Sequence, residues 1–378
     1  MKKITILALH LGYGGIEKCI CDVANLLSND YEIEILTTYK LYEKEVYEFN
    51  KNIKITYLTD VIPNRKEFMQ AFKSFDFPKV LSEGIKSIKV LRLKKTSMIN
   101  ALKNHSSDVY ISTRIYFNNI LGKYGNGLKI GWEHNHHHGN YKYIKSFLKS
   151  CKNLNKVVLV SEELYAFYKK MFKKNKLKCK CEYISNFVDN SKCKMHKLNN
   201  KRLLSVGRLA PEKGYSSLID VFKIIEMVDG DTSLDIVGDG LEYNDIKSKI
   251  IDLNLTRKIK LHGYQNQDYI NKLYSKSSIY LMTSYTESFG LVLVEAMSHG
   301  LVPVAFDSAE GAKNIIKNNY NGILIKNRNE YNMASSVLKL LKNKDKLQKM
   351  SKNAYISSKK YSKEIAKKRW IEVIEGVK

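Results

Sequence analysis

Two glutamates around a glycine-led helix mark the stretch whose residue types best suit chemistry. Glu287 and Glu295 flank Gly290 within Thr283–Asp307, which predicts a buried strand, a loop, a helix over Leu291–Ser298 and a second buried strand. A helix that begins at the carboxyl end of a parallel strand presents free amide N–H groups, which favour phosphate. Glu295, about one and a half turns along this helix, offers two acceptor oxygens that suit the paired hydroxyls of a ribose. The stretch therefore predicts a site for a nucleoside diphosphate.

The sequence around these glutamates resembles a known enzyme family. Within ESFGLVLVEAMSHGLVPVA, Glu287 and Glu295 look like the E-x7-E motif of the retaining glycosyltransferases of family four, the group 1 enzymes, which have the GT-B fold. The resemblance implies that Glu287 contacts the hydroxyls of a donor sugar and that Glu295 holds the ribose. It places four further residues at the donor: Ser288, Phe289, Gly290 and Leu291. The alternative reading is that both glutamates are solvated helix residues.

Two cations upstream match a second motif of the same family. RLLSVGRLAPEKG predicts a strand, a turn and a helix start, and it resembles G-R-x-x-x-E-K-G, in which the arginine and lysine clamp the diphosphate. Arg208 and Lys213 hold these positions, and two fixed cations would replace the divalent metal of other transferases. We therefore expect no metal or cofactor. The alternative is that Arg208 and Lys213 are ordinary surface cations with no role at the diphosphate. The resemblance adds Gly238, in a strand-ending glycine turn, and Gly263 and Tyr264, near the base.

The first half of the chain carries a glycine-rich turn after its first strand. Gly14 and Gly15 follow Lys3–His10, and Glu17 stands where the dinucleotide fingerprint needs a third glycine, which disfavours a nicotinamide site. In the resembling family a G-G-x-E turn lies beside the donor sugar and diphosphate. Phe187, in YISNFVD, replaces a glycine that is common in the family, so the conformation of the local turn is not predicted.

Four histidines cluster in WEHNHHHG, at positions 134, 136, 137 and 138. Neighbouring side chains on extended backbone alternate sides, so these four do not converge on one metal ion. His134 best matches a histidine that in the family ends a strand and faces the sugar, where it would line the acceptor side. The alternative is a polar residue that caps the strand.

Strands and helices alternate along the whole chain. Apolar runs predict strands in the first half at 32–37, 53–58, 109–113, 130–133, 157–160 and 182–184. This alternation indicates doubly wound parallel sheets of the α/β class, and the resemblance implies two Rossmann-like domains facing across a cleft. We expect an acceptor-side domain over 1–189, a linker over 190–201 and a nucleotide-sugar-binding domain over 202–362. The family sends its last helix, here about 363–378, back to the first domain.

Composition limits the class of protein. The 378 residues are 44% hydrophobic, enough for two to three domains, and no run of 18 apolar residues would span a membrane. The apolar start Ile4–Leu11 reaches glycines without a small-residue cleavage site, so we expect a first strand of a cytoplasmic protein rather than a signal peptide. Four of the six cysteines form C-x-C pairs, Cys19/Cys21 and Cys179/Cys181, and this spacing disfavours zinc and redox roles.

A basic segment stands out within the net charge of +26, part of which an AT-rich genome would explain. Residues 65–103 contain ten basic and three acidic residues with apolar residues between them, and we expect elongated or inserted helices there. Such a segment suits an anionic membrane surface on the inner face of a cell membrane. The alternatives are an ordinary solvated helix face and nucleic acid.

The combined expectation is retaining transfer of a sugar from a nucleotide-sugar, a UDP-sugar by resemblance, to a glycan or lipid-linked acceptor in envelope, capsular or exopolysaccharide synthesis. Glu287 and His134 are the candidate catalytic residues. A nucleotide-sugar epimerase or phosphorylase on the same fold is the alternative enzyme. A basic nucleic-acid-binding protein is the non-enzymatic alternative, although no recognition module is present.

Overall fold

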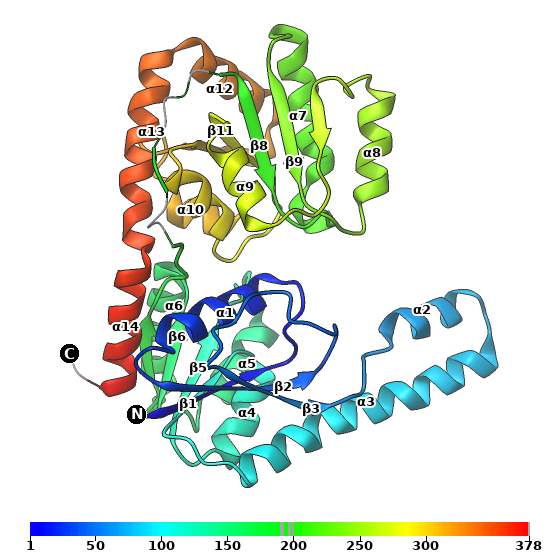
Figure 1. The fold of residues 1–378 in the computed structure, drawn as a ribbon, viewed down its shortest axis with the longest axis vertical. Helices are drawn as coiled ribbons and strands as arrows, with labels where there is room; N and C mark the ends of the chain where they lie inside the picture. The colour runs from blue at the N-terminus through cyan, green and yellow to red at the C-terminus, as the bar shows by residue number, and fades with distance from the viewer. Residues whose placement is uncertain (190–192, 196–197, 199, 377–378) are drawn as a thin grey trace. The chain divides into compact units, whose positions relative to one another are not determined.

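The structure is a computed structural model that describes residues 1–189, 193–195, 198 and 200–376. The chain divides into two compact units (Figure 1). Unit 1 comprises Met1–Ile184 and Lys367–Lys378, and unit 2 comprises Ser185–Ala366. Of the predicted linker over 190–201, residues 190–192, 196–197 and 199 lie outside the described part of the chain.

Unit 1 is built on a seven-stranded parallel sheet. Its order is β3 (Lys54–Thr59), β2 (Glu32–Tyr39), β1 (Lys3–Ala8), β4 (Val109–Ser112), β5 (Leu128–Glu133), β6 (Lys156–Leu159) and β7 (Lys180–Tyr183). Strand β1 lies in the interior of this sheet, so Ile4, Ile6 and Leu7 are fully buried. The order reverses between β1 and β4, which makes this the switch point where loops from opposite directions diverge.

Helices connect the strands of unit 1. They are α1 (Gly15–Leu27), α2 (Arg65–Lys73), α3 (Phe77–Lys103), α4 (Ile115–Tyr124), α5 (Tyr141–Ser150) and α6 (Glu162–Lys174). The basic segment forms the expected pair of helices, α2 and α3. The carboxyl end of the chain also belongs here, because Trp370 is buried against Trp132, with ring centroids 5.1 Å apart.

Unit 2 is built on a six-stranded parallel sheet. Its order is β10 (Ile259–Leu261), β9 (Ser233–Val237), β8 (Arg202–Val206), β11 (Ile279–Met282), β12 (Val302–Phe306) and β13 (Ile323–Ile325). The helices are α7 (Tyr215–Val228), α8 (Tyr243–Asp252), α9 (Gln267–Tyr274), α10 (Leu291–Ser298), α11 (Glu310–Ile315), α12 (Glu330–Lys342), α13 (Lys344–Ser358) and the start of α14 (Lys363–Glu375).

Strand β11 shows why the central stretch is so apolar. Ile279 and Leu281 pack into one hydrophobic cluster with α7 and α12, whereas Tyr280 and Met282 pack into another with α10 and α13. Both faces of the strand are therefore buried, and successive residues serve opposite faces. The prediction of doubly wound parallel sheets in two α/β units is confirmed, and helix α10 has the predicted bounds.

Candidate active site

The candidate donor residues of unit 2 gather where its strand order reverses. Strands β8 and β11 are neighbours in the sheet, with Tyr280 paired to Leu204, although 70 or more residues separate them in sequence. Arg208 and Lys213 follow β8, and Glu287 follows β11. Because parallel strands end at one edge of the sheet, both loops open at the same switch point, where doubly wound sheets bind ligands.

Lys213 and Glu287 form an ion pair at this switch point. Both side chains are largely buried, 23% and 18% exposed, and both line a small cavity floored by Ser205 and Tyr280. The ammonium is thus held beside the loop that leads into helix α10. The structure brings together two of the residues that the two sequence motifs had indicated separately.

The two loops are held together by backbone contacts. Tyr285 N–H donates to the carbonyl of Glu212 (2.8 Å), and Thr283 Oγ1 donates to the carbonyl of Lys213 (3.3 Å). Gly214 has φ of +66°, and a Cβ there would fall inside contact distance of the Thr283 carbonyl. Only glycine therefore lets the loop after β8 approach β11 this closely.

Arg328 fastens the same edge from a later part of the chain. Its Nη1 donates to the carbonyls of Thr283 (2.8 Å) and Ser284 (3.0 Å), and its guanidinium lies over the Tyr285 ring at 3.6 Å. Burial lowers the pKa of this guanidinium. Arg328 and its neighbour Asn327 both have positive φ, +48° and +55°, a strained conformation for a residue with a long side chain.

Helix α10 begins at the end of this loop. Gly290 immediately precedes it with φ of +93°, so the chain turns through a left-handed conformation into the helix. The first amide groups of a helix lack intrahelical acceptors, and here Leu293 N–H turns back to the Gly290 carbonyl (2.9 Å). The amides around Gly290 and Leu291 therefore lie on the same loop as Glu287.

Glu295 is oriented by a buried tyrosine. Tyr274 Oη donates to Glu295 Oε2 (3.1 Å), and burial raises the pKa of Tyr274 well above its ordinary value. Tyr274 in turn stacks on His299, with ring centroids 5.1 Å apart. The carboxylate is thus fixed on the side of α10 by contacts that the motif alone did not reveal.

The remaining predicted donor residues of unit 2 are distributed over neighbouring loops. Arg208 is exposed and pairs with Glu212 at 2.6 Å, one turn along its own loop. Burial tends to raise the pKa of Glu212, but its backbone amide and Arg208 outweigh this and the pKa is lowered. Gly238 N–H donates to the Gly263 carbonyl (2.9 Å), which joins the loops after β9 and β10 beside the exposed Tyr264.

Phe289, on the same loop as Glu287, turns its side chain into unit 2. Its side chain is buried in the hydrophobic core of unit 2, with its ring 5.5 Å from that of Tyr361. The ring therefore anchors the loop, and only the backbone of Phe289 is left to meet a ligand. Ser288, which precedes it, is half-buried on the same loop.

In unit 1 the glycine turn lies at the corresponding switch point. Tyr47 Oη hydrogen-bonds to both the amide (3.3 Å) and the carbonyl (3.1 Å) of Gly14. Gly15 begins α1, and the buried Glu17 in its first turn pairs with Arg114 at 2.8 Å, just after β4. The turn is therefore braced by the loop of Tyr47 and by an arginine from the adjacent strand.

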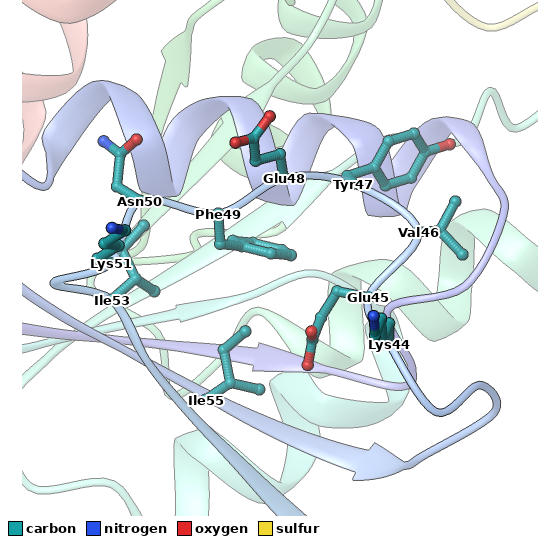
Figure 2. A pocket seen from close by; sticks show the side chains of 10 residues that line it. All are labelled: Lys44, Glu45, Val46, Tyr47, Glu48, Phe49, Asn50, Lys51, Ile53 and Ile55. Carbon is teal, nitrogen blue, oxygen red and sulfur yellow. The ribbon is translucent and has the colours of Figure 1, made fainter. Parts of the chain in front are cut away.

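The loop that carries Tyr47 also borders a cavity of about 520 Å³ (Figure 2). Its lining runs from Lys44 to Ile55, and Figure 2 shows Phe49 and Ile55 pointing toward each other across it. None of the predicted site residues lines this cavity.

His134 follows β5, as predicted for a strand-ending histidine. It is buried against Trp132, with ring centroids 4.2 Å apart, and burial lowers its pKa to about 3, with Arg114 adding to the effect. Its Nε2 has no hydrogen-bond partner among the residues that the structure describes. The imidazole is therefore neutral near pH 7 and offers an uncommitted nitrogen.

Glu133, next to His134, was not predicted from the sequence as a site residue. Its carboxyl accepts from Tyr143 Oη (2.9 Å) and from the Asn135 amide (2.8 Å), yet burial raises its pKa to about 7. Arg114, Tyr274 and Arg328 were also missed, because each acts through a contact between segments far apart in sequence.

Among the described residues, no helix combines the length and the hydropathy needed to cross a bilayer.

Comparison with known proteins identifies the family. Residues 189–357 match the profile of the Glycosyl transferases group 1. An uncharacterized glycosyltransferase of Haemophilus influenzae is 27% identical over 98% of this chain and 99% of its own. A Campylobacter jejuni enzyme named GalNAc-alpha-(1->4)-GalNAc-alpha-(1->3)-diNAcBac-PP-undecaprenol alpha-1,4-N-acetyl-D-galactosaminyltransferase is 23% identical over 100% of this chain and 99% of its own.

Solved structures identify the fold. A mutant of Staphylococcus aureus TarM, crystallised with Fondaparinux, alpha-GlcNAc-glycerol and UDP, aligns with a TM-score of 0.77 at 19% identity, over 99% of this chain and 100% of the other. The predictions of a group 1 glycosyltransferase and of the GT-B fold are thereby confirmed. The chain is a glycosyltransferase with the GT-B fold, and residues 189–357 form its group 1 glycosyltransferase region.

Proposed function

We propose that this enzyme transfers a sugar from a UDP-sugar to a glycan or lipid-linked acceptor of envelope polysaccharide synthesis, with retention of anomeric configuration. The observation that carries the proposal is the pairing of Lys213 with Glu287 at the β8–β11 switch point, beside the start of α10. A cation, helix amides and a carboxylate at one strand edge suit a sugar joined to a diphosphate.

The donor would be held through its charge and its hydroxyls. Lys213 and Arg208 would take the diphosphate together with the amides near Gly290, each cation exchanging its present carboxylate partner for phosphate oxygens. Glu295, oriented by Tyr274, would accept from the ribose hydroxyls. The positive charge of these groups would thereby stabilise the departing diphosphate without a metal ion.

Relatives support the choice of donor and acceptor. The TarM mutant binds UDP, and the Campylobacter enzyme is named for an acceptor joined to undecaprenol through a diphosphate. These properties are the basis for proposing UDP as the nucleotide and a lipid-linked glycan as an acceptor class.

Bond changes on one face of the sugar would give retention. The bond from C1 to the β-phosphate oxygen breaks, the acceptor oxygen bonds to C1 from the same face, and the departing phosphate oxygen takes the acceptor proton. Glu287 would contact the sugar hydroxyls after Lys213 turns to the diphosphate. His134, neutral through burial, would contribute a hydrogen-bonding nitrogen on the acceptor side.

The test is a panel of UDP-sugars with undecaprenyl-diphosphate glycans and soluble oligosaccharides as acceptors. Release of UDP is measured with and without EDTA, and the anomeric configuration of the product is read by NMR. We expect acceptor-dependent release that EDTA leaves unchanged, and an α-linked product from an α-linked donor. An inverted product, an EDTA-sensitive reaction, or epimerisation or phosphorolysis of the donor would contradict the proposal.

A further inference from the structure

The hairpin formed by α2 and α3, residues 65–103, exposes an unusual number of large apolar side chains. They are Met69, Phe72, Phe75, Phe77, Leu81, Ile85, Ile88 and Leu91. Phe75 and Phe77 are 78% and 75% exposed, and Leu81 is 68% exposed. Single exposed apolar residues are common, but eight on one short segment form a contiguous feature that requires an explanation.

The two ends of α3 differ in how they meet unit 1. Val90, Met98 and Leu102, toward the carboxyl end, are buried where α3 packs on β2, β3 and α4. The exposed apolar residues all precede Arg92. Figure 1 shows α2 and the start of α3 extending away from the sheet of unit 1. The carboxyl end therefore anchors the hairpin, and the other end lies beyond the core.

The apolar residues of α3 lie along one side of the helix. Phe77, Leu81, Ile85, Ile88 and Leu91 are spaced by four, four, three and three residues, which is the period of one helical face. This face differs from the face of Glu83, Val90 and Met98, which is buried. The helix thus has two apolar sides, one for the core of unit 1 and one directed elsewhere.

Basic side chains are exposed along the same hairpin. The exposed basic residues of the hairpin are Arg65, Lys73, Lys79, Lys86, Lys89, Arg92, Lys95 and Lys103. Of its three acids, Glu67 is exposed, Glu83 is buried and bonded to Lys86 (2.5 Å) and Asn64, and Asp76 caps α3 by accepting from Lys79 N–H (3.1 Å). Lys94 is turned inward over the Tyr116 ring at 4.2 Å.

We infer that the α2–α3 hairpin docks on an anionic lipid bilayer, with its apolar side in the headgroup and upper acyl region and its cations against lipid phosphates. An apolar helix face bordered by lysine and arginine is the chemistry of an interfacial helix. A second copy of this chain would bring the same excess of positive charge against itself, which opposes pairing, whereas an anionic bilayer complements it. The inference does not depend on the identity of the donor or acceptor.

The test is flotation of the full chain with vesicles of phosphatidylglycerol and phosphatidylcholine, compared with phosphatidylcholine alone. We expect binding to the anionic vesicles that weakens as salt is raised. A charge variant carries Lys79→Gln, Lys89→Gln, Arg92→Gln and Lys95→Gln, and each change should weaken partitioning about fivefold. An apolar variant carries Phe72→Ser, Leu81→Ser and Ile88→Ser, and each change should weaken it about tenfold.

A matched control removes the same charge elsewhere. Lys342, Lys344, Lys346 and Lys349 are exposed on α12 and α13, and their replacement by glutamine should leave flotation unchanged. All the substituted positions are exposed, so melting temperatures should stay close to that of the wild type.

Three outcomes would overturn the inference. The inference fails if the wild type does not float with the anionic vesicles, or if the hairpin variants float as well as the control. It also fails if light scattering shows a dimer that the apolar variant converts to monomer without any vesicle binding, in which case the surface joins two copies. Each readout is independent of sugar transfer, so failure here and failure of the proposed function are distinguishable.

Discussion

Replacing Lys213 by methionine tests the donor site most directly. The change keeps the apolar stem of the side chain and removes the ammonium that pairs with Glu287. Two unit charges about 4 Å apart interact by about 4 kcal/mol at an effective dielectric of 20. The ammonium of Lys213 must leave Glu287 to bind the diphosphate, and the lost ion pair offsets part of this attraction. We therefore expect Lys213→Met to lose about 3 kcal/mol of transition-state stabilisation. That loss corresponds to about a hundredfold in kcat/KM.

The same substitution has a second effect through its partner. Glu287 is only 18% exposed, and without Lys213 its carboxylate faces the incoming diphosphate unpaired. We therefore expect weaker UDP binding by calorimetry as well as slower UDP release. Adding Glu287→Gln should recover part of the UDP affinity, because it removes the repulsion, while transfer stays low.

Lys249 provides the matched control. It is 28% exposed in the same unit and pairs with Asp220 at 2.5 Å, so Lys249→Met removes an equivalent ion pair at α8. We expect this variant to bind UDP and release it within about twofold of the wild type, with a stability loss of about 1 kcal/mol or less. If Lys213→Met turned over within threefold of Lys249→Met, the assignment of the cation to the diphosphate would be refuted.

Three further predictions concern the supports of the site. Arg328→Ala should destabilise the fold by about 2 kcal/mol in thermal unfolding, because two charge-assisted hydrogen bonds to the loop after β11 are lost, and unchanged melting would contradict this. Gly214→Ala should cost at least about 2 kcal/mol, whereas Gly230→Ala, where a Cβ meets nothing within 4 Å, should be nearly neutral. Glu133 has a folded pKa of about 7 against 4.5 for its ordinary value, so the native state binds the extra proton and its contribution to stability falls as pH rises from about 4.5 to 7. Glu133→Gln should remove about 2 to 3 kcal/mol of that pH dependence between pH 5 and 8 in denaturant titrations, and parallel profiles for the two proteins would argue against it.

The sheets could be predicted because buried parallel strands are nearly continuous apolar runs. Strand β11 has apolar residues on both faces, so the sequence shows an unbroken run in place of alternation. The bounds of helix α10 could also be predicted, because Gly290 marks its start. The two motifs also singled out Glu287, Glu295 and Lys213 as candidates, and their roles stay predictions.

The contacts that organise the site could not be read from the sequence in the same way. Arg328 reaches Thr283 across 45 residues, and its neighbour Asn327 shares a positive φ that no local pattern indicates. Tyr274 orients Glu295 from the preceding helix, although its sequence environment is that of an ordinary core residue. The burial of the Phe289 side chain could not be predicted either, because a motif position does not show whether a side chain turns into the core.

The cations after β8 have consequences for selectivity in a strongly basic protein. Lys213 and Arg208 each face a carboxylate of their own unit, so the switch point has little surplus charge to draw in stray polyanions. A lone phosphate would offer fewer contacts than a sugar nucleotide with which to displace both Glu287 and Glu212. Under the proposed function a sugar nucleotide would compensate for that exchange through its ribose and sugar as well, so these counterions would make the enzyme discriminate against other phosphorylated metabolites.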